Sequence, residues 1–194
     1  MATLTVYPDP DPGTNSMDAM ARRSAVDETF GTIRGGAGTS AFPALTSDSP
    51  CSLYSTATSN QYSELRRGIF LFDTSSLPDG ATISAAILSL YVISVPSDAF
   101  VEAVGIVAST PASNTTAVAA DYNIANFGST RFATDKTLAS LVTSAYNDFD
   151  FNASGITAVS LTGISKFGTR FDDDIDNTAP TWSSSVNSQM NIKW

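Results

Sequence analysis

The sequence contains no histidine and only one cysteine, Cys51. Without histidine there is no imidazole to act as a general base, to activate a nucleophile or to bind zinc. A single cysteine forms neither an intrachain disulfide nor a thiolate metal cluster, and its simplest role is that of a small buried hydrophobic residue. We therefore expect a protein that is not an enzyme, with no cofactor and no metal site.

Positive charge is also scarce, because 10 Lys and Arg stand against 19 Asp and Glu, a formal net charge of −9. This leaves no basic surface to neutralise a nucleic acid backbone or an anionic membrane. No apolar run approaches the roughly 20 residues that span a bilayer. The first residues lack the basic and apolar segments of a signal peptide. We expect synthesis in the cytoplasm, a soluble product, no nucleic acid partner and no membrane partner.

Long straight side chains that favour helices are rare, with three Lys and three Glu against 27 Ser and 23 Thr. Serine and threonine alternate with Val, Ile, Leu and Phe along most of the chain, which predicts an all-β protein. The length of 194 residues suits one domain, 1–194. Within it, residues 1–20 are predicted to form an N-terminal strand and a proline-rich arm.

The strongest strand patterns are Arg67–Asp73 and Thr82–Val92, joined by a turn at Pro78-Asp79-Gly80. In the second, Ala86, Leu88, Leu90 and Val92 share one face. Further strands are predicted at Thr3–Tyr7, Thr29–Arg34, Cys51–Ser55, Val101–Ala108, Asp148–Phe151 and Ser165–Phe171. Short helical turns are predicted in the connections Ala117–Tyr122, Lys136–Val142 and Asn152–Val159, the last with Asn152 or Ser154 as its cap. Strands at this spacing predict a two-sheet antiparallel β-sandwich or jelly roll.

One stretch resembles a known family. Three consecutive pieces of it are Phe72-Asp73, then Ser75-Ser76-Leu77-Pro78-Asp79-Gly80-Ala81-Thr82-Ile83, then Ala86-Ile87-Leu88-Ser89-Leu90-Tyr91. Together they are similar to the signature of the DNRLRE-type β-sandwich modules. Members of that family occur as jelly-roll, carbohydrate-binding-like modules on secreted bacterial proteins. Three further segments of this sequence, Thr5–Asp9, Val107–Asn114 and Ala145–Phe149, are similar to segments of stand-alone chains. Those stand-alone chains resemble tailed-phage structural proteins.

The resemblance implies a non-enzymatic virion structural protein, a capsid decoration or head-fibre type of protein in a tailed bacteriophage. The implied partners are the major capsid protein or another virion protein and further copies of this chain, with a trimer favoured, and the implied location is the virion. The alternative is a carbohydrate-binding module of a phage fibre or a secreted bacterial protein, with a surface glycan as its ligand. One sandwich hosts many roles, so the likeness is more specific for fold than for function.

The end of the sequence departs from the family pattern. Such modules close with a hydrophobic strand of the Leu-x-Val-x-Tyr kind, whereas this sequence ends with Met190-Asn191-Ile192-Lys193-Trp194. Either the last strand is missing from the sequence or a neighbouring chain supplies it. We therefore predict that the sheet edge near Trp194 is unpaired within one protomer.

Two groups of carboxylates are candidate calcium ligands. Asp172-Asp173-Asp174-Ile175-Asp176 is the only dense acidic cluster, and Asp9 and Asp11 stand between prolines. The cluster lacks the glycine and terminal glutamate of an EF-hand loop, and Asp-Pro pairs are common in turns, so we expect a solvated loop and a turn. The sequence selects no pair of carboxylates for glycoside hydrolysis.

A sugar-binding surface would need exposed aromatic rings beside polar groups, although Tyr and Trp more often cap a core. The candidates are Tyr54, Tyr62, Tyr122, Tyr146, Trp182 and Trp194. The only paired basic residues are Arg22-Arg23, in a segment expected to be a loop, and Arg66-Arg67. We expect local ion pairs for both, with Arg67 facing an inward carboxylate; an acidic partner surface is the alternative for Arg22 and Arg23.

Overall fold

The structure is a computed structural model that describes residues 2–9, 13–43, 47–96, 99–101 and 103–193. Over these residues the chain is all-β, as predicted: ten strands alternate with a few short helices. In chain order the elements are β1 (Asp18–Glu28), α1 (Phe30–Gly35), β2 (Ser40–Phe42), β3 (Ser47–Ser55), β4 (Tyr62–Asp73), β5 (Ile87–Ser94), β6 (Ala103–Ala108), η1 (Ala119–Tyr122), η2 (Ile124–Asn126), β7 (Lys136–Thr137), η3 (Leu138–Ser140), β8 (Ala145–Asp150), α2 (Ala153–Thr157), β9 (Ile164–Phe171), α3 (Asp172–Asp176) and β10 (Asn187–Lys193).

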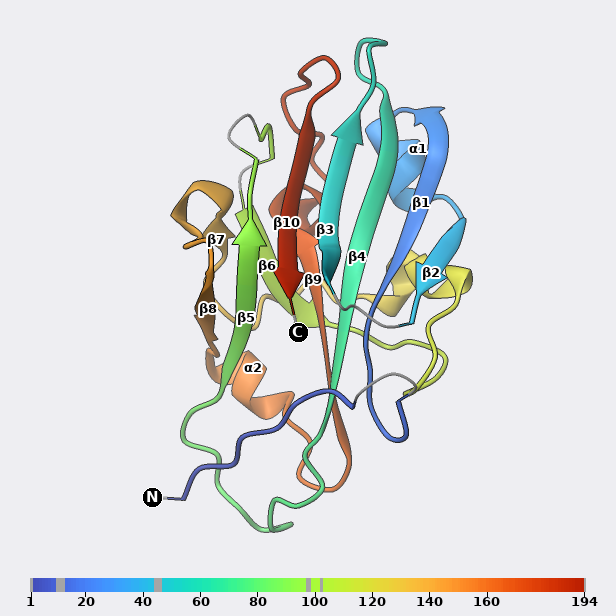
Figure 1. Cartoon of the computed structure of the whole chain (residues 1–194). Coiled ribbons are helices and arrows are strands. Elements are labelled where there is room, and N and C mark those ends of the chain that lie inside the picture. Colours follow the sequence, from blue (N-terminus) through green and yellow to red (C-terminus); the bar gives the residue numbers. More distant parts are fainter. Residues whose placement is uncertain (1, 10–12, 44–46, 97–98, 102, 194) are drawn as a thin grey trace.

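Hydrogen bonds join all ten strands into one antiparallel sheet in the order β7-β6-β9-β4-β3-β10-β5-β8, with β1 beside β4 and β2 beside β1. In Figure 1, β8, β5, β10, β3, β4, β1 and β2 lie side by side, and β9 and β6 lie behind them. The two ends of the order, β7 and β8, come close again, and a single bridge joins Ala133 to Phe151. The sheet is thus nearly barrel-like, and two separate sheets, as a sandwich would have, are not observed.

The core follows the alternation of the strands. On β5, Leu88, Leu90 and Val92 are buried, as predicted, although the strand begins at Ile87 rather than Thr82. Four aromatic rings form a cluster at one end of the sheet, with neighbouring ring centres 4.9–6.3 Å apart: Phe72, Phe132, Phe151 and Phe167. Burial of each such ring contributes about 1.5–3 kcal/mol.

Of three local predictions for the helices and the arm, one is confirmed and two are wrong. Asn152 caps α2 as predicted, since its side chain accepts hydrogen bonds from the N–H groups of Ser154 and Gly155. The strand predicted at Thr29–Arg34 is wrong: this segment forms α1, because Phe30 and Ile33, three residues apart, are both buried on one side of a helical turn. The strand predicted at Thr3–Tyr7 is also wrong, because no described strand pairs with it.

The prediction of an unpaired sheet edge near the end of the sequence is wrong. β10 lies between β3 and β5 and pairs with both. Its residues Ser188, Met190 and Ile192 are fully buried, so one face of β10 packs on the core, and the pairing on both sides makes it a central strand. Trp194 itself lies outside the described residues. β10 therefore offers no open edge to a neighbouring chain.

Candidate functional site

Strand register aligns polar side chains in two rows across five neighbouring strands. The first row runs from β2 to β10 and contains Ser40, Arg22, Arg66, Ser52 and Gln189. The second row, two residues further along each strand, contains Ser24, Glu64, Tyr54 and Asn187. Because alternate residues of a strand point to the same side, both rows lie on one side of the sheet. We call these nine residues, with Phe42, the polar face.

Glu64 is at the centre of the polar face. Its two carboxylate oxygens accept hydrogen bonds from Arg22 Nη1 at 3.0 Å and from Arg66 Nε at 2.6 Å. Arg22 Nε also donates to Ser40 Oγ at 2.8 Å. The side chains of Glu64 and Arg66 are only 8% and 11% exposed, so this Arg–Glu–Arg row is held in one arrangement.

Each of the two arginines packs its guanidinium against one aromatic ring. The guanidinium of Arg22 lies 4.7 Å from the centre of the Phe42 ring, and that of Arg66 lies 5.9 Å from the Tyr54 ring. The hydroxyl of Tyr54 donates to Gln189 Oε1 at 2.6 Å. The charged, amide and aromatic groups of the polar face are therefore preorganised; Ser52, Glu64 and Arg66 are largely covered, and the side chain of Arg22 is 25% exposed.

A tyrosine pair extends this side of the sheet to β5 and β8. Val92 pairs with Ile192, and both point inward, so Tyr91 lies on the same side of the sheet as the polar face. Tyr91 is opposite Tyr146, with ring centres 5.1 Å apart in an edge-to-face arrangement, and Tyr146 is 66% exposed. Beside them, Ser89 Oγ donates to Asp148 Oδ1 at 2.5 Å.

Two of the predicted aromatic candidates are core residues and are not available to a ligand. Tyr62 and Tyr122 are 1% and 0% exposed, and their hydroxyls donate to the carbonyl oxygens of Pro180 and Ile33. Burial raises the pKa of both phenols. Trp182 packs partly against the core. The structure thus leaves Tyr54 and Tyr146 as the predicted rings on the candidate surface.

The solvated loop predicted for residues 172–176 is wrong, because this segment forms α3 and Asp174 is 1% exposed. Asp174 Oδ2 accepts hydrogen bonds from Arg67 Nε and Arg170 Nε, each at 2.8 Å, and Oδ1 accepts one from Arg67 Nη2 at 2.8 Å. Arg34 Nε lies 3.3 Å from Oδ1. The inward carboxylate predicted for Arg67 is confirmed, and it is Asp174.

The charge balance of this buried cluster sets the protonation of its carboxylate. Burial by itself raises the pKa of Asp174, but the charges and hydrogen bonds of Arg67 and Arg170 outweigh it and hold that pKa well below its ordinary range. Arg67 keeps a raised pKa in spite of its burial, because Asp174 faces it. The cluster is a structural link between β4, β9 and α3 rather than an open ligand site.

The other acidic candidate, Asp9, is bound by the turn that follows it. Its Oδ2 accepts hydrogen bonds from Thr14 Oγ1 at 2.7 Å and from the N–H groups of Thr14, Asn15 and Ser16. These bonds, with that of the Thr14 hydroxyl the strongest, lower the pKa of Asp9 to about 2. Asp11 lies outside the described residues. Over the ranges that the structure describes, no three acidic or cysteine side chains are grouped to hold a metal ion.

The ion pairs of Arg22 and Arg23 and the burial of Cys51 agree with the predictions for these residues. Arg22 and Arg23 lie on β1 rather than in a loop, and both form the local ion pairs predicted for them, Arg22 with Glu64 and Arg23 with Glu28. Cys51 is fully buried, as predicted, and burial raises the pKa of its thiol well above its ordinary value.

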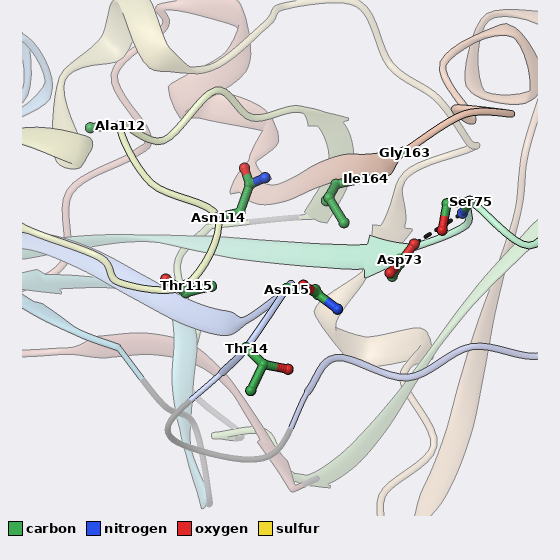
Figure 2. A pocket seen from close by; sticks show the side chains of 9 residues that line it. All are labelled: Thr14, Asn15, Asp73, Ser75, Ala112, Asn114, Thr115, Gly163 and Ile164. Carbon is green, nitrogen blue, oxygen red and sulfur yellow. Dashed lines mark hydrogen bonds between the residues drawn. The ribbon is translucent and has the colours of Figure 1, made fainter.

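A polar cavity of about 480 Å³ lies where the end of β4 meets the start of β9, as Figure 2 shows. Its lining is mainly hydroxyl, amide and backbone groups, with one carboxylate, and comprises Thr14, Asn15, Asp73, Ser75, Ala112, Asn114, Thr115, Gly163 and Ile164. Asp73 accepts a hydrogen bond from the N–H of Ser75, drawn in Figure 2, and its pKa is lowered by its bonds to Ser75. A second cleft of about 410 Å³ separates β7 from β8.

No family model, no curated protein and no solved structure matches this chain. The likeness to DNRLRE-type modules therefore stays a prediction based on residues 67–91. Among the helices that the structure describes, none is long and apolar enough to cross a bilayer. The functional argument therefore depends on the polar face and the neighbouring Tyr91–Tyr146 pair.

Most members of this surface, Glu64 among them, were not singled out in the sequence, and three of them show why. Tyr91 had a usable signal, because the alternation of Thr82–Val92 already placed it opposite the buried residues. Phe42 and Gln189 had none, since each is defined by contacts with residues 20 or more positions away, Arg22 and Tyr54.

Proposed function

We propose that this chain is a non-enzymatic virion structural protein, of the capsid decoration or head-fibre type, that docks on a shell protein through its polar face. The observation that supports this is the fixed Arg22–Glu64–Arg66 row with its flanking rings. Arginine and tyrosine are enriched among the residues that dominate protein interfaces. Side chains already held in one arrangement lose little entropy on binding.

The charge distribution suits this role. The chain carries a formal net charge of −9, yet two arginines stand side by side on the polar face around a single glutamate. A shell surface with carboxylates would therefore be attracted to this face and repelled by most others. The partners in this proposal are the major capsid protein or another virion protein and further copies of this chain, with a trimer matching shell symmetry.

The first test is the number of copies per particle. Quantitative peptide mass spectrometry on purified particles of the source virus measures this chain relative to the major shell protein. A ratio on the order of one copy per shell subunit or per trimer supports decoration, and a handful of copies supports a fibre. Absence of the chain from particles refutes the proposal.

A second test locates the docking surface. We expect Arg22→Ala to reduce binding to empty shells at least about tenfold, since truncating an interfacial arginine commonly costs more than about 1.4 kcal/mol. Arg131→Ala is the matched control, because Arg131 is also a partly exposed, ion-paired arginine, and it lies away from the polar face. Equal binding by both variants would show that docking uses another surface.

The second candidate function is glycan binding, and the Tyr91–Tyr146 pair beside Asp148 is the observation that favours it. Flat rings stack on the C–H faces of sugars while a carboxylate accepts hydrogen bonds from hydroxyls. Binding of neutral oligosaccharides on a glycan array, lost in Tyr146→Ala and retained in Val118→Ala, would support it. Val118 is a suitable control because it is 46% exposed and precedes η1, outside β5 and β8.

A further inference from the structure

The N-terminal arm, Ala2–Asp9, has the pattern of a strand without a strand partner. Leu4 and Val6 alternate with the hydroxyl and phenol side chains of Thr3, Thr5 and Tyr7. In the described part of the chain no ladder pairs with it. Leu4 and Tyr7 are 42% and 71% exposed, so the arm leaves apolar surface in water.

Within residues 2–9, the hydrogen bonds that hold the arm are at Asp9. Asp9 is held by five hydrogen bonds to residues 14–16, whereas among residues 2–8 Val6 packs, in part, against the core. In Figure 1 the arm leads away from the strands at the lower left. Residues 2–8 are therefore the part of the arm that can leave its own protomer while Asp9 stays bound.

The sheet has a matching open edge at β8. This strand is last in the sheet order, and β5 is its strand partner. Phe151 N–H donates to the carbonyl of Ala86, and hydrogen-bonded residues alternate along an antiparallel strand. The backbone N–H and C=O groups of Tyr146 and Asp148 consequently point away from β5, into the cleft that separates β8 from β7, whereas the end of β8 is closed by the bridge between Ala133 and Phe151.

We propose that residues Thr3–Tyr7 of one copy add as a strand to β8 of a second copy. The five residues are one fewer than the six of β8, Ala145–Asp150. The added strand would lie in the cleft between β8 and β7 and would bring backbone partners to the open edge. The interface is between copies of this chain and does not depend on the virion assignment.

Side-chain chemistry fits this pairing. On β8, Asn147 and Phe149 face the core, and Asp148 and Asp150 face outward. A strand with Leu4 and Val6 on the core side has Thr3, Thr5 and Tyr7 on the outer side, beside the carboxylates.

Charge disfavours the simplest competing arrangement. Pairing of β8 with β8 of a second copy would place Asp148 and Asp150 near their own equivalents, and like charges on neighbouring strands are destabilising. The arm segment Thr3–Tyr7 carries no charge. Because the donor arm and the acceptor edge are different surfaces, the contact is heterologous, and it closes into a ring such as a trimer when the rotation permits.

The first experiment compares the mass of the full chain in solution, by size-exclusion chromatography with light scattering, with that of the double variant Leu4→Pro/Thr5→Pro. Successive N–H groups of a strand point to opposite edges, so one of these two prolines must remove a ladder bond. We expect an oligomer for the original chain and a monomer with unchanged circular dichroism for the variant. Ala2→Pro, outside the segment, is the control and should leave the oligomer intact.

The second experiment identifies the contact by mixing two single variants, Thr5→Cys and Asp148→Cys, under mild oxidation. A covalent product of twice the chain mass, absent when Ser76→Cys replaces Asp148→Cys, is the expected result. The native Cys51 is buried and does not interfere. A monomeric original chain, an oligomer that survives the double proline, or a disulfide formed only within one chain of the Thr5→Cys/Asp148→Cys variant would each overturn the proposal. None of these outcomes bears on the copy number in particles.

Discussion

Replacing Asp174 by asparagine should be among the most destabilising single changes in this chain. Asp174 is the one carboxylate that the guanidiniums of Arg34, Arg67 and Arg170 all contact. Arg67 and Arg170 are 0% and 1% exposed, so water cannot replace the lost charge. Asparagine keeps the size of the side chain but turns one hydrogen-bond acceptor into a donor that faces other donors.

The magnitude follows from the burial of the partners. Removing one member of a buried ion pair costs about 3–5 kcal/mol, against a total stability of about 5–15 kcal/mol for a domain. With a urea dependence of about 2 kcal/mol per molar, the midpoint of unfolding should fall by about 1.5–2.5 M. The control is Asp176→Asn on the same helix: its side chain is 54% exposed, and an exposed ion pair contributes about 0–1 kcal/mol.

The assay is urea unfolding followed by circular dichroism and tryptophan fluorescence, for both variants and the original chain, between pH 7 and pH 3. The folded-state pKa of Asp174 lies below its ordinary value of 3.8, so its contribution is fully present above that pH and is lost as the pH falls below it. The stability gap to Asp174→Asn should stay constant from pH 7 to about 5 and shrink below 3.8. A shift no larger than that of Asp176→Asn would refute the reasoning.

Three further outcomes are expected. Gly68→Ala should lower the free energy of unfolding by about 1–3 kcal/mol in thermal or urea melts, because a Cβ there would lie 2.3 Å from the hydroxyl oxygen of Thr169. Gly80→Ala should be close to neutral, because a Cβ at Gly80 would have no heavy atom within 4 Å. The Asp9 carboxyl should titrate in NMR with a midpoint near 2, so the contact between the arm and residues 14–16 should persist at pH 4 and be lost as the pH falls through 2. The Cys51 thiol should resist a thiol-reactive dye in the folded chain and react rapidly in urea, because it is fully buried.

The sequence predicted correctly those elements that depend on residues close to one another along the chain. The alternation of β5, the cap of α2 and the turn after β4 follow from residues close in sequence, and each was found. The helix α1 was missed because Phe30-Gly31-Thr32-Ile33 reads equally well as a short strand. Only the burial of Phe30 and Ile33 together, which is a tertiary fact, decides between the two.

The candidate surface was predictable in part. Tyr54 and Tyr146 were named from their type alone, whereas Tyr62 and Tyr122, of the same type, are buried. Nothing local distinguishes these four residues, because their exposure depends on which segments cover each strand. The sequence also did not show which carboxylate pairs with Arg67. The pairing of β4 with β9 places Arg170 beside Arg67, and Asp174 binds both arginines there.

The position of β10 has a consequence for how the protein is made. A ribosome releases residues 187–193 after all the other strands have emerged, yet β10 is the strand that joins β3 to β5. Until it arrives, β5 and β8 have no backbone link through this route to β3 and β4, and two strand edges stay open to water. The sheet therefore cannot be completed before β10 has emerged, and until then the edges of β3 and β5 are open to pairing with other chains.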